Sequence, residues 1–379
     1  MKKTVAIILV FAMAVSSITI GTATAKAAVD LNTKMAISCE YNVGLKKRTN
    51  YFSQQHQDTI NEKLLKMVGV TDKNWYLKEV PNFASAFQNC KGVPKGMQGI
   101  AANKNNVYFF LNDNKEEAKN QIYKYNINKK ILEPLTIAKS AQNTINSLAF
   151  LKHGNDMEVS TENGSPVLYV VAGKEECDWV YRVVLDDKGT QTQVVKKTKY
   201  TVVKAKTKSK KNKEKISPDG IALIGVKKDK KGNIIQRNFV IRDGKHIYIG
   251  RQKNKSTKIV VYAGCILSMG GIPSIYGGMD YYNNKLYITA TEKKNKMIAY
   301  VQVFDIKKYL NTEKTSFAKT QVKWKKLYYI TGEREKTTMF ELEGCAVVNG
   351  KIFINSNEKI LNKKNEVRNA DRVGILTKK

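Results

Sequence analysis

The sequence predicts an all-β protein, a five-bladed β-propeller preceded by a short N-terminal helical segment; a six-bladed ring is the alternative. Three observations support this prediction. A four-residue motif recurs five times, an aromatic strand follows each copy, and turn-forming pairs such as Asn349-Gly350 join the strand-forming runs. Repeated units of four antiparallel strands are the building blocks of propellers.

Each copy of the motif reads as a polar residue or glycine, a small residue, an apolar residue and then, in most copies, alanine. The copies are QGIA at 98–101, NSLA at 146–149, DGIA at 219–222, GGMD at 277–280 and EGCA at 343–346. The inner strands of a propeller crowd around its axis, so the second and fourth positions must be small for neighbouring blades to approach. Each motif is therefore assigned to an inner strand.

The strands expected after each motif are rich in aromatic and β-branched residues. Second strands are expected at 107–109, 168–170, 247–249, 286–288 and 352–354, and third strands at 122–125, 180–183, 259–262, 301–304 and 373–376. The last unit has too few residues after Glu343 for a fourth strand. The run WYLKEV at 75–80 is predicted to supply it and to close the ring, which removes exposed sheet edges. The propeller is thus expected over residues 75–379.

The amino terminus predicts export. Residues 1–27 combine Lys2 and Lys3, an apolar run from Val5 to Ile20 and small residues up to Ala27, the layout of a secretory signal peptide of Gram-positive style. The mature chain is expected to be extracellular or held non-covalently at the cell wall. Residues 28–74 form an N-terminal extension with one helix expected at 53–68, and no later run is apolar enough to span a membrane.

The cysteines favour neither a zinc site nor a disulfide scaffold. They are widely spaced, form no C-x-x-C pair, and their odd number leaves at least one thiol unpaired. They are Cys39, Cys90, Cys177, Cys265 and Cys345. Most are expected to be small buried hydrophobic residues.

The chain is strongly basic, with 66 Lys and Arg against 33 Asp and Glu, a net charge of +33. Lysines are densest at 196–215, where mutual repulsion predicts a solvated loop between two blades. An anionic wall polymer or glycan is the partner that this charge suggests, with solubility alone as the alternative reading. Export and the lack of a nucleic-acid-binding motif argue against nucleic acid. The polymer-binding candidates are Lys204, Lys206, Lys208, Lys210, Lys211 and Lys213.

The first position of the repeated motif predicts a possible cation site. If the repeat holds, these residues stand at one height around the channel mouth, and four of the five carry side-chain oxygen. Asp280, at the fourth position of its motif, adds a carboxylate. Such donors suit Ca²⁺ better than Mg²⁺, although they could equally bind channel water and each other. The candidate ligands are Gln98, Asn146, Asp219, Asp280 and Glu343.

No familiar catalytic motif is present: the sequence lacks H-E-x-x-H, G-x-S-x-G, a P-loop and an EF-hand. The leading hypothesis is therefore a secreted module that binds anionic polymers or a protein partner at the bacterial cell envelope. The rival is a calcium-dependent hydrolase or lyase at the channel mouth, with Asp219, Asp280 or Glu343 as acid or base.

The motifs, the aromatic strands and the closing segment resemble the β-propeller superfamily over residues 75–379. The stretch EGCAVVNGKIF at 343–353 is also similar to repeats of helveticin-like and gluconolactonase-like secreted propellers. The resemblance to gluconolactonase-like propellers implies a divalent metal at the channel mouth, held here by Glu343, Asp219 and Asn146. A third hypothesis is a bacteriocin-like toxin or a colonisation factor.

Overall fold

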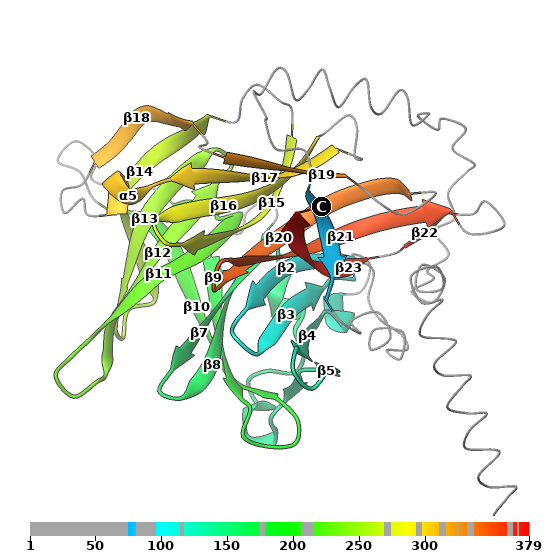
Figure 1. Cartoon of the computed structure of the whole chain (residues 1–379). Helices are drawn as coiled ribbons and strands as arrows, with labels where there is room; N and C mark the ends of the chain where they lie inside the picture. The colour runs from blue at the N-terminus through cyan, green and yellow to red at the C-terminus, as the bar shows by residue number, and fades with distance from the viewer. Residues whose placement is uncertain are drawn as a thin grey trace, which may run out of the picture.

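The computed structural model describes residues 75–80, 96–113, 117–173, 179–205, 215–268, 274–292, 298–310, 316–323, 326–331, 337–361, 367–369 and 371–378, and most of these residues are in β-strands (Figure 1). The helical elements among them are α5 (Lys307–Leu310) and three single 3₁₀ turns at Glu117–Lys119, Lys139–Ala141 and Ala149–Leu151. No helix in this described part is long and apolar enough to cross a membrane.

The strands form five four-stranded antiparallel blades. Blade 1 contains β2 (Met97–Ala102), β3 (Asn106–Leu111), β4 (Gln121–Asn126) and β5 (Ile131–Pro134). Blade 2 contains β7 (Asp156–Glu162), β8 (Ser165–Val171), β9 (Trp179–Asp186) and β10 (Gln193–Lys204). Blade 3 contains β11 (Gly220–Lys228), β12 (Ile234–Asp243), β13 (His246–Lys253) and β14 (Lys258–Ser268).

Blades 4 and 5 complete the set. Blade 4 contains β15 (Ser274–Tyr282), β16 (Lys285–Glu292), β17 (Ile298–Asp305) and β19 (Lys326–Thr331). Blade 5 contains β20 (Thr337–Val348), β21 (Lys351–Leu361), β23 (Arg372–Lys378) and β1 (Trp75–Glu79). Three further strands pair at blade margins: β6 (Thr136–Ile137) on β10, β18 (Ser316–Lys323) on β14 and β22 (Val367–Asn369) on β21.

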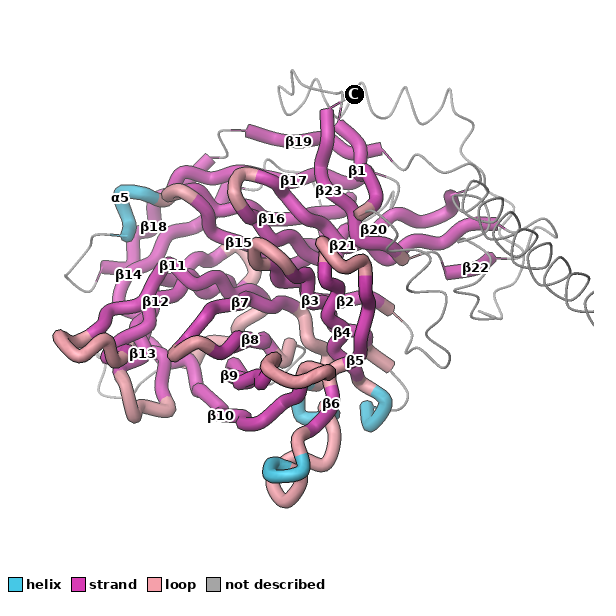
Figure 2. Tube along the Cα trace, turned by 60° about the horizontal axis from the view of Figure 1, so that its bottom comes forward, coloured by secondary structure: helices cyan, strands magenta, loops and turns pink. Residues whose placement is uncertain are grey.

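The blades are arranged as a closed ring. The inner strands β2, β7, β11, β15 and β20 each contact the inner strand of the blade on either side, and they lie around the centre in Figure 2. A hydrophobic cluster fills every one of the five interfaces between neighbouring blades. Between blades 5 and 1, for example, Phe353 packs with Phe109 and Ile100. The five-bladed propeller expected from the repeat is therefore the observed fold.

The ring closes through the N-terminal strand. β1 pairs antiparallel with β23 from Trp75↔Lys378 to Glu79↔Gly374, so the start of the described chain completes the blade formed by its end. This is the pairing that the run at 75–80 was expected to make.

Small residues on the inner strands have the steric role inferred from the motif. A Cβ atom on Gly99 would lie 2.8 Å from the backbone of Asp156 on the neighbouring inner strand. A Cβ on Gly277 would lie 2.5 Å from the carbonyl oxygens of Leu342 and Glu343. These glycines stand at the second position of the first motif and the first position of the fourth, and adjacent blades approach closely at both places.

Outer strands of neighbouring blades pair with each other at two places, which covers sheet edges. β10 pairs in parallel with β14 from Thr201↔Lys258 to Lys204↔Val261, so blades 2 and 3 share one continuous sheet. β1 pairs in parallel with β19 at Trp75↔Ile330 and joins blades 5 and 4. Among the described strands this leaves β5 as the outer edge of blade 1, and its shortness and Pro134 protect it.

Three sequence-based assignments are corrected by these strands. Residues 146–149 are a loop entering a 3₁₀ turn, and the inner strand of blade 2 begins instead at Asp156. In blade 3, residues 247–249 and 259–262 lie on the third and fourth strands, because β12 is the second. The segment expected as a lysine-rich loop is strand β10 as far as Lys204. The signal peptide and the helix at 53–68 lie outside the described residues.

Candidate functional site

The predicted cation ligands are dispersed by the fold. Asn146 is exposed on the loop before β7, so its predicted place on an inner strand was wrong. Gln98 is nearly buried on β2, and Glu343 is half-buried on β20. No group of three or more His, Cys, Asp or Glu side chains within the described part of the chain is arranged to hold a metal ion. Calcium binding stays a prediction.

Asp219 is engaged by an arginine. Its carboxylate forms an ion pair with Arg242, with 2.9 Å between Oδ1 and Nε, and accepts a hydrogen bond from the backbone N–H of Gly244. The fully buried Arg242 also donates to the carbonyl of Gly277, at 2.6 Å. This arginine therefore ties the inner ends of blades 3 and 4 together and places positive charge beside the predicted ligand.

The axis of the ring is occupied by Asp156, the first residue of β7, where residues 155–158 (NDME) take the place of the motif and Asp156 its second position. Its carboxylate accepts hydrogen bonds from the backbone N–H groups of Ile221 at 2.9 Å, Met279 at 3.1 Å and Met157 at 3.0 Å. The donors belong to blades 3, 4 and 2. Complete burial raises the pKa of Asp156 well above its ordinary value, and the three donors with Arg242 oppose that rise. The Asp156 carboxylate thus connects three blades through hydrogen bonds.

A second level of carboxyl groups follows at the fourth position of the motif. Glu158 on β7 accepts from the backbone N–H of Leu223 at 3.0 Å, and Asp280 on β15 accepts from the backbone N–H of Val347. The two carboxyls are also hydrogen-bonded to each other. Burial raises the pKa of Asp280 to about 6, and burial with repulsion from Asp280 raises that of Glu158. The pair shares a proton, which is the arrangement of an acid–base dyad.

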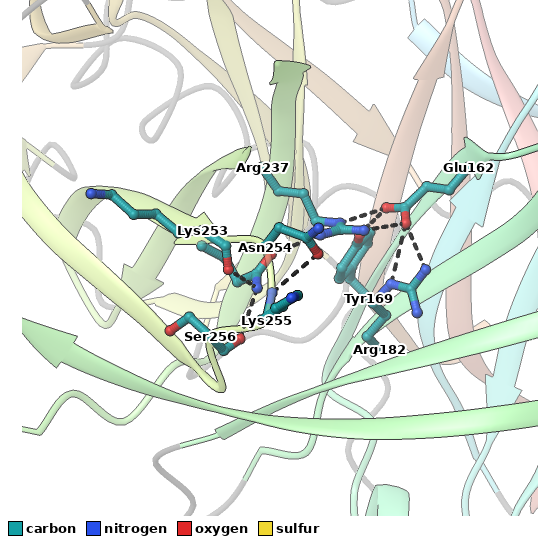
Figure 3. Close-up of polar contacts among 9 residues, drawn as sticks. Glu162, Tyr169, Arg182, Arg237, Lys253, Asn254, Lys255 and Ser256 are labelled. Carbon is teal, nitrogen blue, oxygen red and sulfur yellow. Dashed lines mark hydrogen bonds and ion pairs between the residues drawn. The ribbon is translucent and has the colours of Figure 1, made fainter. Parts of the chain in front are cut away.

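A buried ion cluster joins blades 2 and 3 farther from the axis (Figure 3). Glu162, at the end of β7, accepts hydrogen bonds from Arg237 at 2.8 and 2.6 Å, from Arg182 at 2.6 and 3.2 Å, and from the hydroxyl of Tyr169. Burial alone would raise the pKa of Glu162, but these donors overcome it and lower the pKa to about 2. Glu162 therefore stays ionised between two cations.

The ion cluster also fixes a surface hairpin. Arg237 donates through a third nitrogen to Gln252 at 2.9 Å, and Gln252 in turn donates to the carbonyls of Lys253 at 2.5 Å and Ser256 at 2.7 Å. Figure 3 shows this chain of contacts running from Glu162 to the turn that follows β13. The buried residues Arg237 and Gln252 thus fix the backbone of the turn that carries these lysines.

Two adjacent turns of blade 3 present a concentrated positive surface, here called the lysine hairpins (residues 227–233 and 253–258). They lie side by side, because Lys253 pairs with Gln236 and the N–H of Asn254 donates to the carbonyl of Ile235. All of their lysines are exposed, and none forms an ion pair with a residue in the described ranges. These are Lys227, Lys228, Lys230, Lys231, Lys253, Lys255 and Lys258.

Asp229, the acidic residue within the lysine hairpins, forms hydrogen bonds within its own turn. Asp229 accepts hydrogen bonds from the backbone N–H groups of Lys231 at 2.9 Å and Asn233 at 2.8 Å and from the Asn233 side chain, which lower its pKa. It shapes its own turn, and the surface keeps an excess of positive charge.

The predicted polymer-binding lysines are placed only in part. Lys204 ends β10, half-buried, with its ammonium 5.6 Å from the ring centroid of Tyr248. Lys206, Lys208, Lys210, Lys211 and Lys213 lie outside the described residues. The lysine hairpins were not among the candidates, although their density of lysine in turn-forming sequence was a usable signal.

No protein-family model matches the chain, and no curated protein matches its sequence. Solved structures resemble it only distantly. An α-L-arabinanase from Cellvibrio cellulosa, solved with arabinohexaose, has 10% identity and a TM-score of 0.39 over 75% of this chain and 91% of that one. A GH43 endo-arabinanase from Bacillus licheniformis has 11% identity and a TM-score of 0.36 over 75% and 93%. The xyloglucan-locus protein GH43B of Bacteroides ovatus has 9% identity and a TM-score of 0.39 over 75% of this chain.

The chain spans only 51% of the length of the Bacteroides ovatus protein and 36% of a bifunctional GH43 protein from Bacteroides eggerthii. The propeller assignment for this chain rests on its own strand pairing, described above. The finer resemblance to helveticin-like and gluconolactonase-like proteins is not supported.

Proposed function

We propose that the protein is a secreted module that binds anionic polymers of the cell envelope through the surface of blade 3. The observation that carries this proposal is the unneutralised charge of the lysine hairpins, seven exposed lysines on two adjoining turns. Export rests on the N-terminal sequence.

The lysine hairpins combine exposed positive charge with an ordered backbone. Isolated surface lysines contribute little to recognition, whereas clustered cations near an anionic surface contribute about 1 kcal/mol each. Gln252 and Asp229 fix the two turns, so the lysines present their charge from an ordered backbone. A polymer with regularly spaced anionic groups can contact several of them at once, which gives avidity without a deep pocket.

The test is binding of the mature protein to polyphosphate by isothermal calorimetry at several salt concentrations. Changing both Lys227 and Lys253 to Glu is expected to weaken binding at least about thirty-fold, from about 1 kcal/mol per lysine. The control is Lys104→Glu with Lys129→Glu, two exposed lysines on adjoining turns of blade 1. The control carries the same change in net charge. Equal losses in the two variants would mean that net charge acts, and not this surface.

A second candidate is a glycan hydrolase that uses the Glu158–Asp280 pair, and the hydrogen bond between these two carboxyls is the feature that favours it. One carboxyl in its acid form would protonate a leaving oxygen while the ionised partner deprotonates water, as in other carboxyl dyads that share one proton. The pKa of Asp280, about 6, suits both roles near neutral pH. Each carboxyl would then have to act on substrate while it still accepts a hydrogen bond from a backbone N–H group.

The hydrolase candidate is tested by release of reducing sugar from arabinan, xylan and isolated cell walls. Activity of the wild-type chain that disappears in both Glu158→Gln and Asp280→Asn, with unchanged melting temperature, supports an enzyme. Turnover that persists in both variants excludes this pair as the catalyst. Addition of EDTA and then Ca²⁺ to the same assay tests the calcium dependence predicted from the sequence.

A further inference from the structure

Blade 2 carries half-exposed aromatic rings beside lysines, at its outer edge next to blade 3. The ammonium of Lys199 lies 3.5 Å from the ring centroid of Trp179, and that of Lys197 lies 4.4 Å from the ring centroid of Phe150. Phe150 meets Tyr181 edge-to-face, with 4.8 Å between centroids. We call Phe150, Trp179, Tyr181, Lys197 and Lys199 the aromatic–lysine strip.

Strand register places this strip on one face of the joined sheet. Lys199 is paired with Tyr181, and Thr201 with Trp179, across the antiparallel β9–β10 pair. Thr201 is also paired with Lys258 across the parallel β10–β14 pair. Directly paired residues project to the same side of a sheet. The aromatic–lysine strip therefore continues onto the first residue of β14, at the edge of the lysine hairpins.

The rings of the strip remain open to solvent. Phe150, Trp179 and Tyr181 are each half-buried, whereas Tyr169, in the core on the other face of blade 2, is fully buried. A cation–π contact at an exposed site is weak enough to be exchanged for a ligand. The same contact keeps each ammonium beside a ring, so charge and flat apolar surface are presented together.

We propose that the aromatic–lysine strip binds an anionic polysaccharide, a chain of sugar rings that bear carboxylate, sulfate or phosphate groups. The C–H faces of the sugars contact Trp179 and Tyr181, and the anionic groups pair with Lys197, Lys199 and Lys258. The proposal rests on the proposed function and narrows its ligand class, because lysines alone accept any polyanion whereas rings select for a sugar chain. The predicted export of the chain favours glycans over nucleic acids as the occupant.

The experiment compares four probes on the mature protein: polygalacturonate, polyphosphate, dextran and oligo-dT. Trp179→Ala is expected to weaken polygalacturonate binding about ten-fold and to leave polyphosphate binding unchanged. Trp179→Phe is the matched control. The indole N–H of Trp179 has no hydrogen-bond partner among the described residues, so phenylalanine keeps the ring and loses no bond. Lys199→Gln, which is expected to weaken binding of both anionic polymers, serves as a second variant if Trp179→Ala fails to fold.

The outcomes separate the two proposals. If Trp179→Ala weakens binding of polygalacturonate and polyphosphate equally, or weakens neither, the strip is not a polysaccharide site. The proposed function is then unaffected. Binding of dextran as tight as that of polygalacturonate overturns the role of charge. Oligo-dT binding with the same dependence on Trp179 overturns the glycan in favour of single-stranded nucleic acid. Failure of the wild-type protein to bind either anionic polymer overturns the proposed function itself.

Discussion

Glu158 and Asp280 are hydrogen-bonded to each other although their inner strands belong to blades 2 and 4, with blade 3 between them in the ring. Each carboxyl also accepts a backbone N–H from the next blade, Leu223 for Glu158 and Val347 for Asp280. The pair therefore links four of the five inner strands. Its proton is a structural component of the ring, since two ionised carboxylates at this distance would repel.

The stability of the ring is expected to fall as the pH rises from about 4 to about 7. Because the pKa values of both carboxyls are raised, the folded chain holds a proton that the unfolded chain releases near its ordinary pKa of about 4. This contribution is complete below that pH and is lost as the pH rises through the folded pKa, about 6 for Asp280. It amounts to about 3 kcal/mol at 1.36 kcal/mol per unit. Urea unfolding between pH 4 and 8 measures it.

Glu158→Gln supplies the comparison for this pH profile, because glutamine cannot ionise. Its free energy of unfolding is expected to vary less with pH than that of the wild type. Asp371, whose pKa burial beside Glu358 raises to about 7, is present in both proteins and leaves a common residual slope. Identical slopes for the two proteins would show that the pair does not share a proton.

Removal of the Asp156 carboxylate is expected to loosen three blades at once. In Asp156→Ala the N–H groups of Ile221 on blade 3 and Met279 on blade 4 lose their acceptor at a fully buried position. Each buried unsatisfied donor costs about 1–3 kcal/mol, so the free energy of unfolding should drop by roughly 3 kcal/mol or more. Asp229→Ala is the control. Asp229 also accepts two backbone N–H groups, but water replaces it in an exposed turn. Comparable losses would contradict a special role for the axis.

The propeller could be predicted from sequence because the geometry of the axis imposes a residue pattern. Gly99, Gly278 and Gly344 are small because neighbouring inner strands touch there, and this constraint produced four of the five motifs. The fifth assignment failed for the same reason. Blade 2 has Asp156 and Glu158 at the two small positions, so a search for small residues passed over the inner strand and settled on NSLA at 146–149.

The Glu158–Asp280 pair was therefore only half recognised, because a carboxylate stands where the search expected a small residue. Asp280 was recognised because a glycine pair precedes it, whereas Glu158, its hydrogen-bond partner, lies in a blade whose pattern is broken twice.

The lysine-rich segment was misjudged for a different reason. Its charge suggested a loop, but Tyr200 and Val202 alternate inward between the lysines, which is the period of a strand. Contacts between blades, such as Arg237 with Glu162, carry no local sequence signal.

The Glu162 ion cluster is expected to be among the most sensitive sites in the fold. Glu162→Gln removes the negative charge and leaves Arg237 and Arg182 without their anion, which should lower the free energy of unfolding by about 3–5 kcal/mol. The control is Glu117→Gln, which breaks the exposed ion pair with Lys152 and should cost no more than about 1 kcal/mol. Similar urea midpoints for the two variants would argue against the buried cluster as an inter-blade clamp.

The acid limb of unfolding tests the same cluster. The pKa of Glu162, lowered to about 2, means that its stabilisation is complete above the ordinary pKa of about 4.5 and is lost as the pH falls toward 2. The wild type should therefore lose stability over this range more steeply than Glu162→Gln, whose free energy of unfolding lacks this contribution at every pH. Parallel acid limbs would mean that Glu162 is not ionised in the folded chain.

Gly277 is expected to tolerate no side chain, because the backbone of the neighbouring inner strand β20 lies against it. A Cβ atom there would lie 2.5 Å from the carbonyl oxygens of Leu342 and Glu343, and strand β20 cannot retreat without separating blades 4 and 5. Gly277→Ala should therefore cost about 1–3 kcal/mol or prevent closure of the ring. Gly189→Ala is the matched change, since its nearest neighbouring atom would be 3.9 Å away. If thermal unfolding shows both alanine variants at the wild-type melting temperature, the inner strands are farther apart than this ring requires.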